Sequence, residues 1–210
     1  MEKESAYFPY LINENKNADT LMASCFNPLR LGIAPMERRK RPIALLTDND
    51  YFNWETIPIT SVAKTDKKFT VTIGAYQGNL SWSGSVWTLI NETVIRGLID
   101  CGETDLAAIL IEKTLKVFRH NCAEFVDPFN GCGQGVLQYA WTASQYLELI
   151  VEGLFGIHYN AKEKKITVSP VLTASSQNSY LELKDLRITD KITLDTVIDH
   201  GKVSYSVSNN

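Results

Sequence analysis

Three helical stretches in the middle of the chain differ in how their apolar residues are distributed around the helix. Residues 85–100 and 136–154 carry apolar side chains over most of the circumference, which is typical of helices that are covered on all sides. Residues 104–120, which lie between them, place charged side chains along one side only, so we expect this helix to face water. Two concentric layers of helices produce such an alternation. The sequence therefore predicts a mainly helical domain with an inner and an outer layer.

The region before these helices is punctuated by prolines. A helix is expected over residues 18–26, and it should end before Asn27-Pro28 because the residue before a proline is pushed out of the helical region. Pro35 can open a second helix, since proline is well suited to the first helical turn. Pro42 is then expected to kink or restart that helix.

Beyond Gly156 the apolar residues recur with period two, which indicates antiparallel strands separated by short turns. The expected strands are residues 156–159, 165–168, 180–183, 191–194 and 202–207. We therefore expect two parts. The first is a helical domain at residues 1–155, and the second is a small antiparallel β appendage at residues 156–210 that packs on it.

Composition and charge exclude several classes of partner. The chain has 210 residues, of which 44% are hydrophobic and 21% charged, which is enough to bury a sizeable core. A formal net charge of -3 provides no basic surface for nucleic acid or an anionic membrane. No apolar run approaches the ~20 residues of a membrane span, and the first residues lack the apolar core of a signal peptide. We therefore expect a cytoplasmic protein that binds neither nucleic acid nor a membrane.

The four cysteines predict neither a metal site nor a disulfide scaffold. Cys25, Cys101, Cys122 and Cys132 are far apart, form no Cys-x-x-Cys pair and have no adjacent histidine cluster. We expect all four to be reduced and structural, since a free cysteine behaves as a small buried hydrophobe. Neither a metal nor a cofactor is expected.

A glycine-rich loop at residues 122–135 carries the first candidate functional group. Asp127-Pro128 and Asn130-Gly131 are turn dipeptides, so Asp127 is interpreted as a turn former. Loops of fixed shape between rigid elements often hold catalytic groups, which makes Glu124 a candidate. The residues alone leave two other interpretations open: Glu124 is a surface loop carboxylate, or it is a residue at the C-terminal end of the helix that pairs with His120 or Arg119.

A second long loop, residues 56–85, contains aromatic residues that argue against disorder. Tyr76 and Trp82 lie within it, and Trp87 follows it. Trp87 and Trp141 suit either a core position or the apolar face of a sugar ring.

Taken in order, these residues form a set of motifs. The set is Ser81-Trp82-Ser83-Gly84-Ser85-Val86-Trp87 with Asn91, then Ala123 to Gly133, then Trp141-Thr142-Ala143, then Gly153-Leu154-Phe155-Gly156. From about residue 57 to 170 the chain resembles the C-terminal half of the six-hairpin (α/α)6-barrel glycoside hydrolases. That group contains processing α-glucosidase I and mannosylglycerate hydrolase, with trehalase more distant.

The resemblance implies roles for particular residues. In those enzymes the loop glutamate is the general base of an inverting hydrolysis, which implies this role for Glu124. An inverting glycosidase also needs a carboxylic acid roughly 6.5–9.5 Å away that protonates the leaving oxygen. The residues expected to contact the carbohydrate substrate are Tyr76, Trp82, Trp87, Asn91, Gln134 and Trp141.

Two departures from the family pattern limit these implications. Ser83 stands where the family commonly has arginine, and the position that matches the acid would precede Met1. A complete six-hairpin barrel needs roughly 400 residues, so the chain provides about half of the (α/α)6 toroid. Within the chain, the general acid could come only from the upstream acids that lie near aromatic residues, which are Asp48, Asp50 and Glu55.

The sequence therefore predicts part of an inverting glycoside hydrolase that cleaves an α-glucosidic or α-mannosidic bond. Its general acid would come from the missing half, supplied by a partner chain or by self-association that completes the helical barrel. The alternative is a noncatalytic carbohydrate-binding or interaction protein derived from the same fold.

Overall fold

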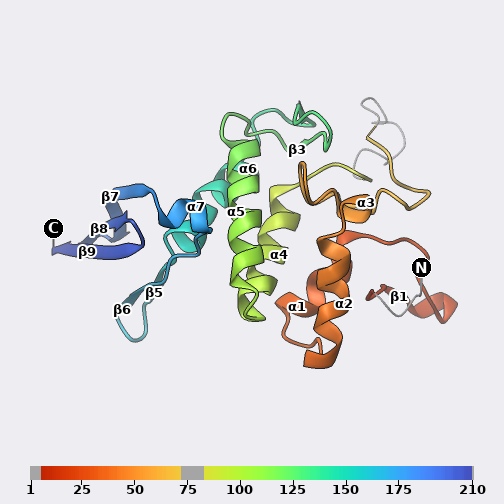
Figure 1. Ribbon diagram of the computed structural model, residues 1–210, viewed down its shortest axis with the longest axis horizontal. Helices are drawn as coiled ribbons and strands as arrows, with labels where there is room; N and C mark the ends of the chain where they lie inside the picture. Colours follow the sequence, from red (N-terminus) through yellow and green to blue (C-terminus); the bar gives the residue numbers. More distant parts are fainter. Residues whose placement is uncertain (1–5, 72–82, 210) are drawn as a thin grey trace. The chain divides into compact units, whose positions relative to one another are not determined.

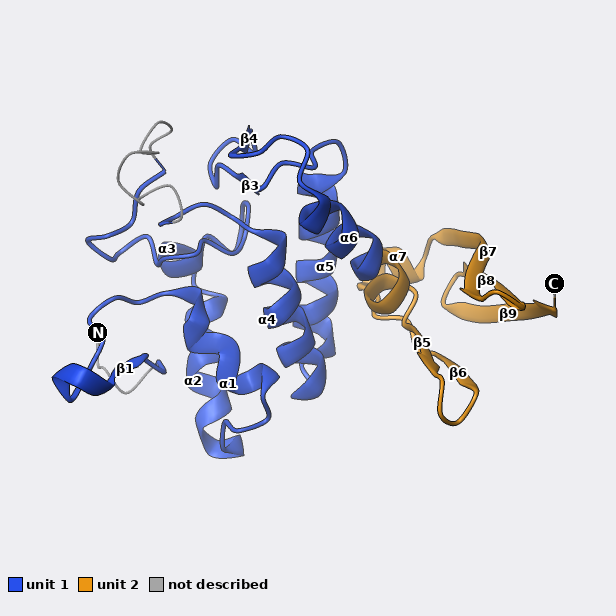
Figure 2. Cartoon of the chain, turned by 180° about the vertical axis from the view of Figure 1, so that it is seen from behind, with its two compact units in different colours: residues 1–149 blue, residues 150–210 orange. Residues whose placement is uncertain are grey.

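The computed structural model describes residues 6–71 and 83–209 of the chain, which divides into two compact units (Figures 1 and 2). Unit 1 comprises residues 1–149 and unit 2 residues 150–210, so the division falls a few residues before the boundary expected near Phe155. Within the described residues unit 1 is mainly helical and unit 2 contains small antiparallel sheets. This confirms the expected mixture of helices with a C-terminal β appendage.

The helices of unit 1 are mostly short. They are α1 (Asn27–Arg30), α2 (Met36–Leu46), α3 (Asn49–Phe52), α4 (Thr88–Asp100), α5 (Thr104–Phe118) and α6 (Ala140–Glu148). The prediction of a helix over residues 18–26 that ends before Pro28 is wrong. A 3₁₀ turn at Ala23–Phe26 leads directly into α1, where Pro28 occupies the first turn and no intrahelical N–H is needed. No described helix is long and apolar enough to cross a membrane.

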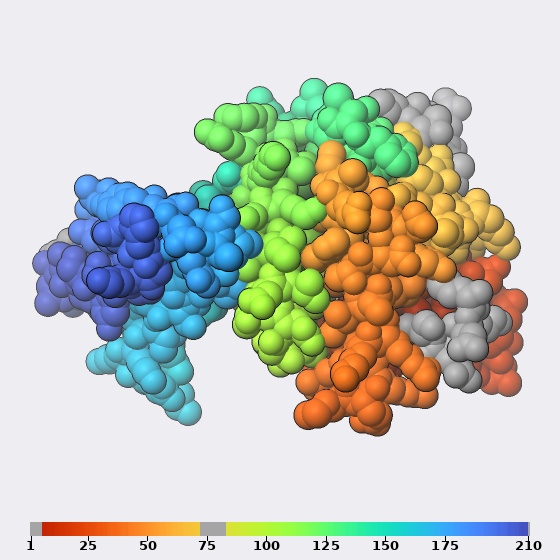
Figure 3. Space-filling model, viewed as in Figure 1, coloured from red at the N-terminus to blue at the C-terminus, as the bar shows by residue number. Residues whose placement is uncertain are grey.

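The α4–α5 hairpin forms the centre of unit 1, with the two helices side by side (Figure 1). Val94, Ile95 and Leu98 on α4 and Leu110 and Ile111 on α5 are almost completely buried. The charged side of α5 remains outside, and Figure 3 shows this helix at the molecular surface along its length. The amphipathic pattern therefore predicted the environment of α5 correctly.

The environment of α6 differs from the prediction. The helix begins at Ala140 rather than at residue 136, and it passes into a π-helical turn at Leu149–Leu154. Complete burial was expected, but Trp141 is 49% and Leu147 62% exposed. Among the described residues of unit 1 no element covers this apolar side, so the pattern overstates the burial of α6 within its own unit.

Polar contacts inside unit 1 join α6 to α4. The hydroxyl of Thr88 donates a hydrogen bond to Oε1 of Gln145 at 2.9 Å, in a buried position. Arg96 on α4 pairs with Glu92 on the same helix and with Glu148 on α6. These contacts fix the position of α6 relative to α4.

Isolated β-bridges join three segments of unit 1 that are far apart in the sequence. Thr60 pairs with Val86, and Val86 also pairs with Val126, in both cases antiparallel. The N–H groups of Val86 and Val126 each donate to the other residue's carbonyl at 3.0 Å. The segment before α4, which contains Val86, therefore lies between the segment after α3 and the loop after α5 and is bridged to both.

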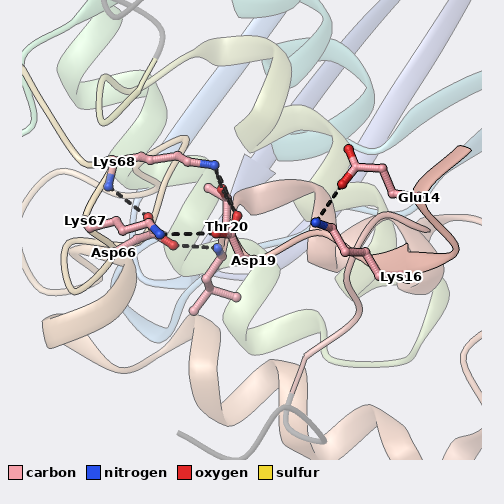
Figure 4. A network of polar contacts seen from close by, with 8 residues as sticks. Glu14, Lys16, Asp19, Thr20, Asp66, Lys67 and Lys68 are labelled. Atoms are coloured by element: carbon pink, nitrogen blue, oxygen red, sulfur yellow. Dashed lines mark hydrogen bonds and ion pairs between the residues drawn. The ribbon is translucent and has the colours of Figure 1, made fainter. Parts of the chain in front are cut away.

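An exposed polar network attaches the N-terminal segment to residues 66–68 (Figure 4). A carboxylate oxygen of Asp66 accepts a hydrogen bond from the backbone N–H of Leu21 at 2.8 Å. Lys67 and Lys68 each place their ammonium group 3.2 Å from the carboxylate of Asp19. Hydrogen bonds and charge from these two lysines lower the pKa of Asp19 to about 2.

The network predicts a stability difference that depends on pH. An unfolded aspartate has a pKa of about 4, so the lowered pKa means that the Asp19 carboxylate stabilises the fold above about pH 4 and loses this effect as the pH falls towards 2. We expect Asp19→Asn to be slightly less stable than the wild type at neutral pH, and the difference to disappear as the pH falls below about 2. Thermal denaturation across this range would measure the difference. It should shrink in high salt, since the pairs are exposed; a difference that is constant with pH would contradict the assignment.

The described residues of unit 2 form two antiparallel sheets and one short α-helix, which follow the π-helical turn that ends at Leu154. Strands β5 (Ile157–Asn160) and β6 (Lys165–Val168) form a hairpin, and β7 (Tyr180–Thr189), β8 (Ile192–Asp199) and β9 (Lys202–Asn209) form a sheet in that order. Helix α7 (Ala174–Gln177) lies between them in the sequence. The buried core of the unit consists of Phe155, Ile157, Leu194 and Ile198. The structure confirms the antiparallel strands predicted from the period-two pattern.

Candidate functional site

The loop that follows α5 folds back on itself as a small hairpin. Strands β3 (Phe125–Val126) and β4 (Gly133–Gln134) pair antiparallel, and Asp127 begins the turn between them. Oδ1 of Asp127 accepts hydrogen bonds from the N–H groups of Phe129 at 2.8 Å and Asn130 at 3.2 Å. Asp127 thus holds the turn, as its interpretation as a turn former requires.

Two buried side chains outside the hairpin fix its position. The hydroxyl of Thr142, at the start of α6, donates to the carbonyl of Ala123 at 2.9 Å. Asn53, which follows α3, donates from Nδ2 to the carbonyl of Pro128 at 2.8 Å. Both residues are almost fully buried. Thr142 belongs to a motif found in the sequence, but its anchoring role and that of Asn53 depend on contacts between distant residues and give no local signal.

Glu124 lies at the base of the hairpin, half-buried, with its backbone and side chain both bonded to Val136. Its N–H donates to the carbonyl of Val136 at 2.8 Å, and its Oε2 accepts from the N–H of Val136 at 3.2 Å. Among the described residues no hydrogen bond to Oε1 is found. The bond to Oε2 therefore orients the carboxylate. Neither His120 nor Arg119 forms an ion pair with Glu124 among the described residues.

Gly135 makes room for the Glu124 carboxylate. Its φ is +71°, a conformation that side chains resist, and a Cβ at this position would lie 2.6 Å from Oε2 of Glu124 and 2.7 Å from the ring of Phe125. Gly102, at the end of α4, has a similar φ of +83°, but nothing lies within 4 Å of the position of its Cβ. An alanine at either position would strain the backbone, but only an alanine at position 135 would also displace the Glu124 side chain. Comparing the two variants therefore distinguishes the two effects.

We expect Gly135→Ala to lower the free energy of unfolding by about 2–3 kcal/mol, because backbone strain and a steric clash add together. Gly102→Ala is expected to lower it by about 1 kcal/mol from strain alone. Urea denaturation of the two variants beside the wild type would measure both values. Equal losses would show that the carboxylate does not pack against Gly135.

The aromatic residues predicted to contact a sugar fall into different environments. Trp141 is half-exposed at the start of α6 and stacks with Tyr139, with ring centroids 6.5 Å apart. Thr142 donates a hydrogen bond to Ala123. Trp141 precedes Thr142 in the sequence and Glu124 follows Ala123, so this bond links the segments that carry Trp141 and Glu124. Trp87, by contrast, is only 4% exposed and stacks on Phe125 at 4.7 Å. Tyr76 and Trp82 lie outside the described residues.

The two predicted amide contacts also differ. Asn91 is completely buried, and its amide bonds to three groups of the protein: the N–H of Ile59 and carbonyl of Pro58 on one side, and Thr114 on the other. Its visible role is to hold the extended segment before the first motif against α4. Gln134 is also buried, with only 7% of its surface exposed, and its Nε2 has no hydrogen-bond partner among the described residues.

Of the three upstream acids near aromatic residues, Asp48 has a clear structural role. Asp48 caps α3 by accepting a hydrogen bond from the N–H of Asp50 at 2.9 Å. All four cysteines are free, in agreement with the prediction that they are reduced. Cys25 is buried and Cys101 partly buried, whereas Cys122 and Cys132 are exposed on the loop and do not pack in a core. Within the described residues no group of three His, Cys, Asp or Glu side chains converges as a metal site would require.

A concave surface of unit 1 lies between α1 and α4 and encloses about 620 Å³. Its lining is mostly apolar and includes Leu31, Leu89, Ile90 and Val94, with Ser24 and Arg30 at polar positions. Glu124 is not part of this lining. The cavity and the hairpin are therefore separate features of unit 1.

Comparisons with known proteins show the family to which the chain belongs. Residues 2–142 match the family described as the mannosylglycerate hydrolase MGH1-like glycoside hydrolase domain. Over 73 residues the chain is 34% identical to the mannosylglycerate hydrolase of Rubrobacter radiotolerans, a match that covers 34% of this chain and 16% of that protein.

Solved structures show the same fold. The GH63 mannosylglycerate hydrolase of Thermus thermophilus in complex with glucose matches with a TM-score of 0.60 and 22% identity, over 70% of this chain and 36% of that chain. A sialidase matches with a TM-score of 0.67 and 14% identity, over 94% of this chain and 21% of that chain. The chain thus spans well under half the length of these relatives. The family match extends over most of unit 1, including α4, α5 and the Glu124 hairpin, and the chain belongs to the family of mannosylglycerate hydrolase MGH1-like glycoside hydrolase domains.

Proposed function

We propose that this chain carries the general-base part of an inverting glycoside hydrolase that cleaves an α-glucosidic or α-mannosidic bond. Glu124 activates the attacking water, and the general acid comes from a part of the fold that the chain does not cover. The observation that carries the proposal is the Glu124 carboxylate, held by the N–H of Val136 above Gly135 in a loop of fixed shape.

The geometry of Glu124 suits a base. A general base needs a fixed direction and a free lone pair within reach of the water whose proton it takes. The bond from Val136 to Oε2 provides the direction, and Oε1 provides the lone pair. Because the side chain is half-buried, the group can be reached by a substrate without being fully solvated.

The surroundings of Glu124 suit a sugar. Trp141 and Leu137 expose apolar surface on the segment that leads from the hairpin into α6. An aromatic face packs well against the C–H face of a pyranose ring. Gln134 adds an amide donor without a partner among the described residues, which could satisfy a sugar hydroxyl. We do not include Trp87 and Asn91 among the proposed sugar contacts, because both are buried and contact other residues of the protein.

The missing acid is expected in a chain that packs against unit 1 and completes the (α/α)6 toroid. Two apolar surfaces support such an addition: the exposed side of α6, and the groove between α1 and α4 beside the exposed residues Leu31, Ile33 and Met36. The solved relative contains more than half of its length beyond the part that this chain matches. A partner chain or a second copy would supply the remaining helices.

The stereochemistry of the product tests this proposal. Mannosylglycerate and aryl α-glucosides would be offered to the full chain, purified both alone and with any chain that copurifies from its source. Inversion of an α-glycoside releases the β-anomer first, which ¹H NMR distinguishes before mutarotation. The α-anomer as first product would overturn the inverting mechanism. Sugar binding without any turnover would favour a noncatalytic carbohydrate-binding protein.

A further inference from the structure

Strand β9 forms one edge of the three-stranded sheet of unit 2 and leads to the C-terminus (Figure 1). It pairs with β8 in unbroken register from Lys202 to Asn209. On its other side no strand pairs with it among the described residues, and every residue of the strand is exposed. Unpaired backbone groups along such an edge are a template for another strand.

The opposite edge of the same sheet is protected, whereas β9 is not. Proteins block free edges with bulges, charges or proline. Strand β7 has register shifts after Leu183 and after Arg187, and Asp185 within it has a φ of 53°. Its residues 182–187 also include four charged side chains. From Val203 to Asn209, β9 contains no charge, no proline and no glycine. Only the β9 edge of the sheet is open to pairing.

The turn before β9 determines which backbone groups face outward. His200 and Gly201 both have positive φ, 45° and 76°, as a two-residue type I′ turn requires. Such a turn closes on a hydrogen-bonded pair, here Asp199 and Lys202. The alternation that follows directs the N–H and C=O groups of Val203, Tyr205 and Val207 away from β8. These three residues therefore hold the free backbone donors and acceptors of the edge.

The sequence of this edge is a palindrome. Val203-Ser204-Tyr205-Ser206-Val207 is the same in both directions. In an antiparallel pair centred on Tyr205, each Val203 faces Val207 of the other strand, the serines face each other, and Tyr205 faces itself. The outward backbone groups of Tyr205 then meet their equivalents, as a hydrogen-bonded pair requires. We propose that β9 pairs antiparallel with β9 of a second copy of this chain about a twofold axis at Tyr205.

The side chains on the two faces of β9 agree with this pairing. Val203, Tyr205 and Val207 lie opposite Ile198, Thr196 and Leu194, which are completely buried. The apolar row of β9 therefore continues the core side of the sheet, although its own residues are 41%, 60% and 50% exposed. Pairing across the twofold axis would place apolar side chains opposite apolar side chains and extend this row. Because the interface is the same on both copies and β7 is blocked, the assembly closes as a dimer.

Charged residues introduced at the twofold axis test the proposal, which is independent of the glycosidase assignment. The mass of the full chain would be measured by sedimentation velocity over a range of concentrations. We expect a dimer in the wild type, and Tyr205→Lys and Tyr205→Glu should each raise the dissociation constant by at least about tenfold, since like charges then face each other. An equimolar mixture of the two variants should recover the dimer.

Tyr180 supplies the matched control, because it is 58% exposed, close to the 60% of Tyr205, but lies at the start of β7. Tyr180→Lys should leave the dissociation constant unchanged, and circular dichroism should show that all variants remain folded. A monomeric wild type would overturn the proposal. So would a dimer that is insensitive to both charges at Tyr205, or variants that do not recover the dimer on mixing, since either result places the contact elsewhere.

Discussion

Replacement of Glu124 by glutamine is expected to reduce turnover by ~10²–10⁴-fold, the usual effect of removing a positioned general base. Glutamine keeps the size of the side chain and can still accept a hydrogen bond from Val136, so the loop should keep its shape. What it cannot do is take a proton from water. The loss is therefore expected in kcat, with little change in the affinity for the sugar.

The measurement requires the assembled enzyme and a matched control. Glu37 lies exposed in the first turn of α2, outside the Glu124 hairpin, and Glu37→Gln makes the same change of charge without touching the site. Its kcat should equal that of the wild type. Near-normal turnover in Glu124→Gln would remove Glu124 as the base and require another carboxylate in this role.

Asn91→Ala is expected to lower the free energy of unfolding by about 3–4 kcal/mol, the largest stability effect proposed for this chain. The change leaves the N–H of Ile59 and the carbonyl of Pro58 without the partners that they have now, at 2.9 and 2.8 Å. Both lie in a buried segment, and each unpaired buried group costs about 1–3 kcal/mol. The lost packing around a fully buried side chain adds to this.

Thr93 provides a control on the same helix. Its hydroxyl donates to the carbonyl of Leu89 at 2.9 Å but is only partly buried, so Thr93→Ala should change stability by less than about 0.5 kcal/mol. Chemical denaturation measures both variants. A stable Asn91→Ala variant with weakened sugar binding would instead restore Asn91 as a substrate contact.

The sequence predicted those features whose cause is local. The charged stripe of α5 and the period-two strands of unit 2 follow from the positions of apolar residues along each element. The turn at Asp127 follows from its side chain, which bonds to the N–H groups just after it. In each case the interacting groups are neighbours in the sequence, so the pattern contains the information.

Other features were not predicted correctly or gave no local signal. Pro28 was expected to stop a helix, whereas it lies in the first turn of α1, where proline leaves no intrahelical hydrogen bond unmade. Asn91 is predicted to contact the substrate from its place in a motif, and its hydrogen bonds to Pro58 and Ile59 gave no local signal because these residues belong to another segment. The exposure of Trp141 could not be predicted either, because an apolar helix pattern does not show whether a covering element is present.

We expect the ladder from Thr60 through Val86 to Val126 to form late during folding. Its three members are far apart in the sequence, and contacts between distant segments form late because closing a long loop costs more entropy than winding a helix. The α4–α5 hairpin must first bring its two ends together before Val86 can meet Val126. We therefore expect Glu124, two residues before that bridge, to reach its position in one of the last steps of folding. Weakening the Val86–Val126 bridge should disorder the proposed base before the rest of unit 1 unfolds.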